Sequence, residues 1–345
     1  MPQSGSGSRS RPPTISDVAQ AAGVSRTTVS HALNGIGKVD PRTREHVRKT
    51  AADLGYRPNL RAQRLRRGEA KAIALASSMP FAVAGGPSRL GFYMEVAAAA
   101  AESALLHGYA LVLVPPVQST SALYSVDIDG AIVVEPDVDD AAAAQLRERN
   151  LPYVALGRPV SADEEVPYVD LHGGRVTELL LTHLHEQGAR RPALIVGSGS
   201  RHSSVDALAA YERVCARYGW EPVVAHAPEE GGEDAGYESC AALLAAHPDL
   251  DAVCAMVDAF AVGAVRAVRD SGRTVPGDVM VATRYDGLRA RTCEPPLTAV
   301  DLHLDRAASD AVALLLNRLR GEPATAAALP KAPEPRVVAR ASTLR

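Results

Sequence analysis

Apolar residues recur at helical spacing near the start of the chain. Four of them fall at positions i, i+3, i+4 and i+7, which form one face of a helix: Ile15, Val18, Ala19 and Ala22. Thr14 precedes this run, and Asp17 lies three residues after Thr14, so the two can form a capping pair at the start of the helix. Gly23 then interrupts the pattern where a reversing chain requires a positive φ or a close backbone approach. The pattern predicts a short helix followed by a tight turn.

A second helix is predicted directly after this turn, with Ser25 as its cap. Its apolar positions form an inner face: Val29, Ala32 and Leu33. Its polar positions share the outer face: Arg26, Thr27, Ser30 and His31. A small helix pair whose second helix presents hydrogen-bonding groups is typical of proteins that read the major groove of DNA. An ordinary helical hairpin with a solvated outer face would have the same pattern.

A third helix is predicted from Asp40 to Gly55. Asp40 can cap it, and Pro41 suits its first turn. The expected apolar stripe consists of Val47, Ala51 and Leu54. Three helices of this size could close a very small core.

From Lys71 onward the pattern changes to alternating strands and helices. Short apolar runs predict strands at 72–76, 110–114, 130–134, 153–156, 192–196, 251–256 and 279–282. Helical patterns lie at 95–107, 139–149, 178–187, 207–218, 261–270 and 306–319. Alternation of this kind predicts parallel sheets. The strands are too many for one sheet, which favours two lobes with a cleft between them.

Charge is distributed unevenly along the chain. Residues 1–71 contain 14 Lys or Arg and 5 Asp or Glu, a net charge of +9, so the remaining residues carry −12 of the total of −3. A basic segment on an acidic body is typical of a polyanion-binding module joined to a separate domain. A solvated basic face is the alternative, but it does not explain why the excess coincides with the helix-turn-helix pattern.

Composition narrows the class of protein further. The chain of 345 residues is 46% hydrophobic and 22% charged, as in ordinary globular proteins. No apolar run reaches transmembrane length and residues 1–13 lack a signal segment, so we expect a cytoplasmic protein without membrane contact. The four cysteines are widely spaced and form no CxxC motif, which favours reduced thiols over disulfides or a metal site.

Enzyme signatures are missing from the sequence. Residues 197–200, GSGS, do not form a nucleophile elbow, and no phosphate loop or dinucleotide fingerprint occurs. His183 and His185 are two apart on a predicted helix, so they face different directions and cannot share a metal. We therefore expect a protein that is not an enzyme, with no cofactor and no metal.

Three stretches resemble one family: DVAQAAGVSRTTVSHALNG, the helix at 40–55, and GYRPNLRAQRLRRG. They are similar to the headpiece and hinge of the lactose-repressor (LacI/GalR) family of bacterial transcription regulators. The resemblance implies an N-terminal all-α helix-turn-helix headpiece (14–57), a hinge helix (58–68) and an α/β two-lobed periplasmic-binding-protein-like core with parallel sheets (69–345). Residues 1–13 are Ser, Gly, Arg and Pro, and we expect them to be a disordered tail.

The resemblance also implies DNA-binding roles for individual residues. Base-reading positions are Arg26, Thr27, Ser30 and His31, and phosphate-binding positions are Ser25, Arg42 and Arg48. Hinge residues that would enter the minor groove are Asn59, Ala62, Gln63 and Leu65, with Leu65 as the wedge between base steps. The family most often has Arg at the position of His31. The implied partner is a near-palindromic double-stranded operator, bound by a homodimer.

For the core, the resemblance implies a small-molecule effector between the lobes. The candidate effector-binding residues, which match family pocket positions or lie next to them, are Asp206, Asp258, Tyr285 and Asp286. Val257 replaces a family Asn, and Ala207 stands where the first turn of a helix normally presents an Arg. These losses disfavour an ordinary sugar, because unpaired buried hydroxyls cost about 1–3 kcal/mol. Asp258 and Asp286 could instead cap turns or helices, and an effector-blind architectural DNA-binding protein with a degenerate pocket stays the alternative function.

Overall fold

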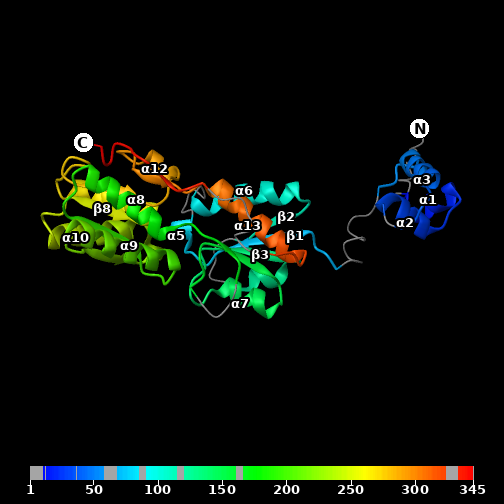
Figure 1. Cartoon of the computed structure of the whole chain (residues 1–345), viewed down its shortest axis with the longest axis horizontal. Coiled ribbons are helices and arrows are strands. Elements are labelled where there is room, and N and C mark those ends of the chain that lie inside the picture. Colours follow the sequence, from blue (N-terminus) through cyan, green and yellow to red (C-terminus); the bar gives the residue numbers. More distant parts are fainter. Residues whose placement is uncertain are drawn as a thin grey trace, which may run out of the picture. The chain divides into compact units, whose positions relative to one another are not determined.

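The computed structural model describes residues 11, 13–35, 37–57, 68–84, 91–114, 120–160, 166–323 and 333–344. The chain divides into two compact units, residues 1–69 and 70–345 (Figure 1). None of the helices in the described part of the chain is long and apolar enough to cross a membrane.

The N-terminal unit consists of the three predicted helices. They are α1 (Ile15–Ala22), α2 (Arg26–Asn34) and α3 (Pro41–Asp53). Their apolar faces close one small core: Val18, Ala19, Ala22, Val29, Ala32, Val47 and Ala51. The predicted faces of α1 and α2 therefore meet as expected, with Leu33 partly buried against this core.

Local capping explains why these helices begin and end where they do. The predicted pair at the start of α1 is a complete capping box, in which the Thr14 backbone N–H donates to Asp17 Oδ2 at 2.7 Å. Gly23 ends α1 with a left-handed φ of 65°. The prediction for Leu54 is wrong, because this residue caps the C-terminus of α3 and is 40% exposed. Tyr56 packs against the core instead.

The first lobe of the second unit, the N-terminal lobe, has a five-stranded parallel sheet in the order β2-β1-β3-β4-β5. Its strands are β1 (Ala72–Ala76), β2 (Ala110–Leu113), β3 (Gly130–Val134), β4 (Tyr153–Leu156) and β5 (Tyr168–Val169). Its helices are α5 (Phe81–Ala84), α6 (Phe92–Leu106), η1 (Thr120–Ser125), α7 (Ala141–Glu148) and α13 (Leu304–Leu319). Alternate residues of β1 face α6 and α13 on one side and α7 with η1 on the other.

The C-terminal lobe has a four-stranded parallel sheet in the order β7-β6-β8-β9. Its strands are β6 (Pro192–Gly197), β7 (Val224–Ala227), β8 (Ala252–Ala255) and β9 (Met280–Thr283). Its helices are α8 (Gly173–Glu186), α9 (His202–Tyr218), η2 (Glu229–Gly231), α10 (Gly232–Ala246), α11 (Asp258–Asp270) and α12 (Leu288–Thr292). One face of the sheet packs on α8 and α9, and the other on α10 and α11.

The chain passes between the lobes three times. It first leaves the N-terminal lobe after β5, which pairs with β4, at residues 170–172. It returns through β10 (Ala299–Asp301), and α13 then packs beside α6 (Figure 1). Finally β11 (Arg336–Val338) pairs antiparallel with β10.

Candidate functional site

The first turn of α2 presents two unobstructed polar side chains. Ser25 precedes the helix, and its Oγ accepts a hydrogen bond from the Thr28 N–H at 3.0 Å. Arg26 and Thr27 follow and are exposed, while Val29 turns inward to the core. The cap and the buried residue fix both ends of this turn, so Arg26 and Thr27 project from a rigid element.

The other two predicted base readers are less open. Ser30 is half-buried and accepts a hydrogen bond from Asn34 Nδ2 at 3.3 Å. His31 is half-buried as well, with its ring against the turn that follows α2, since a Cβ at Gly37 would lie 2.9 Å from His31 Nδ1. These two side chains therefore lie on the outer face but are partly engaged by their own helix and turn.

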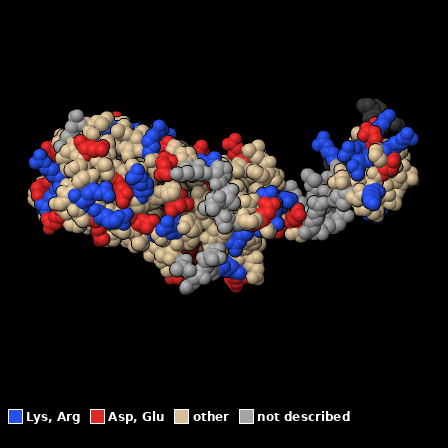
Figure 2. Space-filling view, viewed as in Figure 1, with Lys and Arg blue, Asp and Glu red and all other residues tan. Residues whose placement is uncertain are grey.

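Basic side chains accompany this face. Arg42 and Arg48 on α3 are exposed, as the phosphate-binding role requires. Figure 2 shows several Lys and Arg side chains on the visible surface of the N-terminal unit. The predicted hinge residues Asn59, Ala62, Gln63 and Leu65 lie outside the described residues, so their roles stay predictions.

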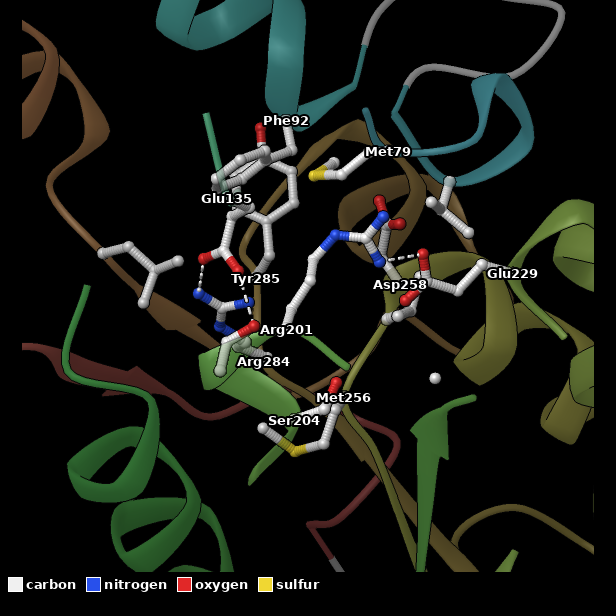
Figure 3. A pocket seen from close by; sticks show the side chains of 15 residues that line it. Met79, Phe92, Glu135, Arg201, Ser204, Glu229, Met256, Asp258, Arg284 and Tyr285 are labelled. Carbon is white, nitrogen blue, oxygen red and sulfur yellow. Dashed lines mark hydrogen bonds and ion pairs between the residues drawn. The ribbon is translucent and has the colours of Figure 1, made fainter. Parts of the chain in front are cut away.

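A cavity of about 70 Å³ lies between the two lobes of the second unit, with room for several water molecules. Four of its walls come from residues at the carboxyl ends of parallel strands: Glu135 after β3, Gly197 at the end of β6, Met256 after β8 and Arg284 after β9. Carboxyl ends of strands are where open α/β sheets bind their ligands. Apolar walls come from Met79 and Phe92 (Figure 3), together with Val83, Val257 and Leu302.

Charged groups inside the cavity are paired with one another. Arg284 Nη2 lies 2.6 Å from Glu135 Oε1, and the two side chains are 12% and 4% exposed. Arg201 donates to Glu229, and both are also buried (Figure 3). Burial raises the pKa of Glu229, although the Arg201 guanidinium works in the opposite direction. Two cations and two carboxylates thus balance each other.

Two of the four predicted effector residues line this cavity. Asp258 is buried at the start of α11, and burial raises its pKa although Arg289 Nη1 lies 3.3 Å from its Oδ1. Tyr285 donates its hydroxyl to Glu95 and meets the Phe92 ring edge-on at a centroid distance of 5.5 Å. Burial is also the main cause of the raised pKa of Tyr285.

The other two predicted effector residues, Asp206 and Asp286, do not line the cavity. Asp206 Oδ2 lies 3.1 Å from His202 Nδ1, one turn earlier on α9, and Asp206 is not among the lining residues. Asp286 is held by Arg340 at 2.7 Å and by Arg291 at 3.5 Å, near the C-terminal crossover. The structure therefore assigns Asp286 to an ion-pair cluster outside the cavity.

Comparisons with known proteins agree with this geometry. The family described as bacterial regulatory proteins, lacI family, matches residues 14–59, and the periplasmic binding protein-like domain matches residues 181–343. The HTH-type transcriptional regulator CelR of Thermobifida fusca is 34% identical over 330 residues, which cover 91% of this chain and 94% of CelR. The chain belongs to the LacI family.

Solved LacI-family structures share the fold of the whole chain. The complex of CelR with cellobiose is 29% identical with a TM-score of 0.69, and the match covers 96% of this chain and 99% of that one. The lac repressor dimer bound to operator and the anti-inducer ONPF is 26% identical with a TM-score of 0.74, covering 97% and 100%. This LacI-family chain is a DNA-binding transcriptional regulator.

The principal charged residues of the cavity were not predicted from the sequence. Ala207, where the resemblance implies the loss of an Arg, is buried in the core of the C-terminal lobe, five residues after α9 begins at His202. Arg201, directly before the helix, lines the cavity instead. A usable signal was present, because Glu135 and Arg284 each follow an apolar strand, where a charged residue faces the cleft.

Proposed function

We propose that this chain is a repressor that binds a near-palindromic operator as a homodimer. The observation that carries the proposal is the rigid first turn of α2, with Arg26 and Thr27 exposed and Ser25 fixed as the cap. One headpiece reads few base pairs, so two copies are needed for both affinity and specificity.

Individual roles follow from side-chain chemistry. Arg26 can form a bidentate hydrogen bond with guanine, and Thr27 can bond to a base or contact a thymine methyl. Arg42 and Arg48 suit phosphates, because they are exposed cations on a neighbouring helix. Ser30 and His31 would refine the base preference from the same face.

The proposed effector is a small molecule that binds in the cavity between the lobes. Its binding changes how the lobes are arranged, and thereby the spacing of the two hinges in the dimer. Arg201 and Arg284 line this cavity and carry hydrogen-bond donors, which suit a ligand that bears hydroxyl groups. Cellobiose, which is bound in the CelR structure, is the first ligand to test.

One observation favours a second candidate, an effector-blind architectural DNA-binding protein. The cavity is small, and its four central charged groups are already paired internally. Isothermal titration with cellobiose and other metabolites separates the two candidates, since an effector-blind protein binds none of them and keeps its operator affinity in their presence.

Arg26→Ala tests the reading face, with Arg48→Ala as the matched loss of one cation. An operator is first selected from random DNA, and binding is then measured by fluorescence anisotropy. Arg26→Ala should weaken operator binding by about 1–3 kcal/mol and relax one base position per half-site, because the bidentate bond is lost. Arg48→Ala should weaken operator and random DNA alike. An equal loss on both DNAs for Arg26→Ala would contradict the assignment.

A further inference from the structure

The buried ion pair between Glu135 and Arg284 joins the two lobes. Glu135 follows β3 of the N-terminal lobe, and Arg284 follows β9 of the C-terminal lobe. Ser203, in the first turn of α9, donates a second hydrogen bond to the same carboxylate. The Glu135 side chain therefore bridges the cleft to two separate segments of the opposite lobe (Figure 3).

The backbone places Glu135 in an uncommon conformation. Its φ is 48°, a left-handed value that is unfavourable for a residue with a Cβ. Its N–H donates to Leu156 O at 2.7 Å, and Gly157, with a φ of 99°, leaves space beside it. A Cβ at Gly157 would lie 3.3 Å from Glu135 Cδ. Strained positions of this kind are retained where the surrounding structure holds them, often at functional sites.

Further polar contacts cross the cleft around this pair. Ser200 of the C-terminal lobe donates to Asp137, which lies two residues after Glu135. Tyr285 reaches Glu95 on α6 of the N-terminal lobe. Arg289 on α12 donates to Ala82 O at 3.0 Å. The pair is therefore the buried, charged member of a set of direct polar contacts between the two lobes.

We propose that Glu135 is an internal latch: its carboxylate occupies Arg284 and holds the two lobes closed in the effector-free protein. The inference rests on the proposed function, in which lobe spacing controls DNA affinity. An effector that enters this cavity must compete with Glu135 for Arg284, so regulation proceeds by release of the latch. Because a buried charge without its partner is strongly disfavoured, loss of either member should open the cleft.

The latch is tested by a distance measurement across the cleft in the full chain without effector or DNA. Spin labels are attached at Asp139→Cys and Val205→Cys, two exposed positions on opposite lobes, in a chain that also carries Cys293→Ser. Labelled subunits are diluted with unlabelled protein, and distances are measured by electron–electron double resonance. The otherwise unchanged chain should give one narrow, short distance.

Glu135→Gln should lengthen and broaden this distance, and Arg284→Gln should do the same. The double variant should show no further change, because both substitutions remove one interaction. Glu178→Gln is the matched control, since Glu178 pairs with Arg213 at 3.2 Å within the C-terminal lobe. It should leave the distance unchanged.

Two results would overturn the latch. One is a broad, long distance in the labelled chain that retains both Glu135 and Arg284. This measurement does not depend on the folding of any latch variant. The other is an unchanged distance in either folded single variant, with folding checked by thermal melting. Neither result touches the proposed DNA-reading role, which is tested separately by Arg26→Ala.

Discussion

Glu229 is a single residue at which two opposing effects act. Burial raises its pKa above the ordinary value of 4.5, while the Arg201 guanidinium lowers it, and the net shift is upward. A raised native-state pKa means that the folded chain holds a proton that the unfolded chain has released. The contribution of this carboxyl to stability is therefore complete at low pH and is lost as pH rises through the native pKa.

Glu229→Gln should reveal this dependence. The free energy of unfolding of the parent chain should fall, relative to that of the variant, as pH rises from below 4.5 toward neutrality. The substitution also leaves Arg201 without a charged partner, which changes the free energy of unfolding by an amount that depends little on pH. Urea unfolding at a series of pH values measures both quantities. Parallel pH profiles of the two proteins would mean that the Glu229 pKa is not raised.

For single residues, hydrogen bonds between close neighbours in the sequence could be predicted, but ion pairs between residues far apart in the sequence could not. The caps of Thr14, Ser25 and Asp40 follow from spacings of three residues, so the sequence contains all the information they require. Asp286 pairs instead with Arg340, which lies 54 positions away. Only the folded crossover brings those two side chains together, so the sequence offered no reason to remove Asp286 from the cavity.

Among the elements, α2 combines folding and recognition at Ser25, the residue that directly precedes it. Ser25 caps the helix, and it is also a proposed phosphate contact. Ser25→Ala should destabilise the headpiece by about 0.5–2 kcal/mol because the cap is lost. Ser25→Asp should preserve the cap but weaken DNA binding, since it adds a negative charge facing phosphates. Thermal melting and operator anisotropy separate the two effects, and undiminished DNA affinity in Ser25→Asp would exclude the phosphate contact.

The packing of α10 against α11 depends on a glycine. A Cβ at Gly263 would lie 2.0 Å from Glu233 O, which is far inside contact distance. Gly263→Ala should therefore destabilise the second unit by about 1–3 kcal/mol or more, because the two helices must separate. Gly272→Ala, with nothing within 4 Å of its Cβ but a φ of 79°, is the comparison for backbone strain alone. Urea unfolding measures both, and an equal loss would contradict the close approach.

The same pair shows which elements the pattern could predict. Strands β1, β3 and β4 match their predicted limits, because each is a short apolar run between polar turns. Helix α10 was missed entirely. Its first turn lies in a glycine-rich stretch, EEGGEDAG at residues 229–236, that is typical of a loop, and its packing against α11 could not be predicted from the sequence. Strand β5 was missed because two residues are too few to form a pattern.

Across the whole molecule, the separation of charge predicts the salt dependence of binding. Residues 1–71 carry a net charge of +9 and the remainder −12, so DNA affinity should depend on phosphate contacts from the basic segment. The logarithm of the association constant should fall linearly with the logarithm of salt concentration, by about 0.9 per phosphate contacted. Arg48→Ala should reduce this slope by about one per headpiece.

Arg213→Ala is the matched control for that series. Arg213 is an exposed arginine of the C-terminal lobe, paired with Glu178, and its loss should leave the slope unchanged. Anisotropy titrations at several salt concentrations measure each slope. Salt-insensitive binding by the parent chain would contradict an electrostatic role for the basic segment.

The return of α13 to the N-terminal lobe sets the order in which the molecule can be completed during synthesis. Leu314 and Leu315 of this helix are buried in the core that β1 and α6 began more than 200 positions earlier. The ribosome releases the headpiece first, yet the sheet of the lobe that follows it lacks one of the two helices that cover one face until α13 emerges. A nascent chain can therefore present its DNA-reading helices long before it has a finished lobe behind them, and truncation before α13 would leave that lobe permanently incomplete.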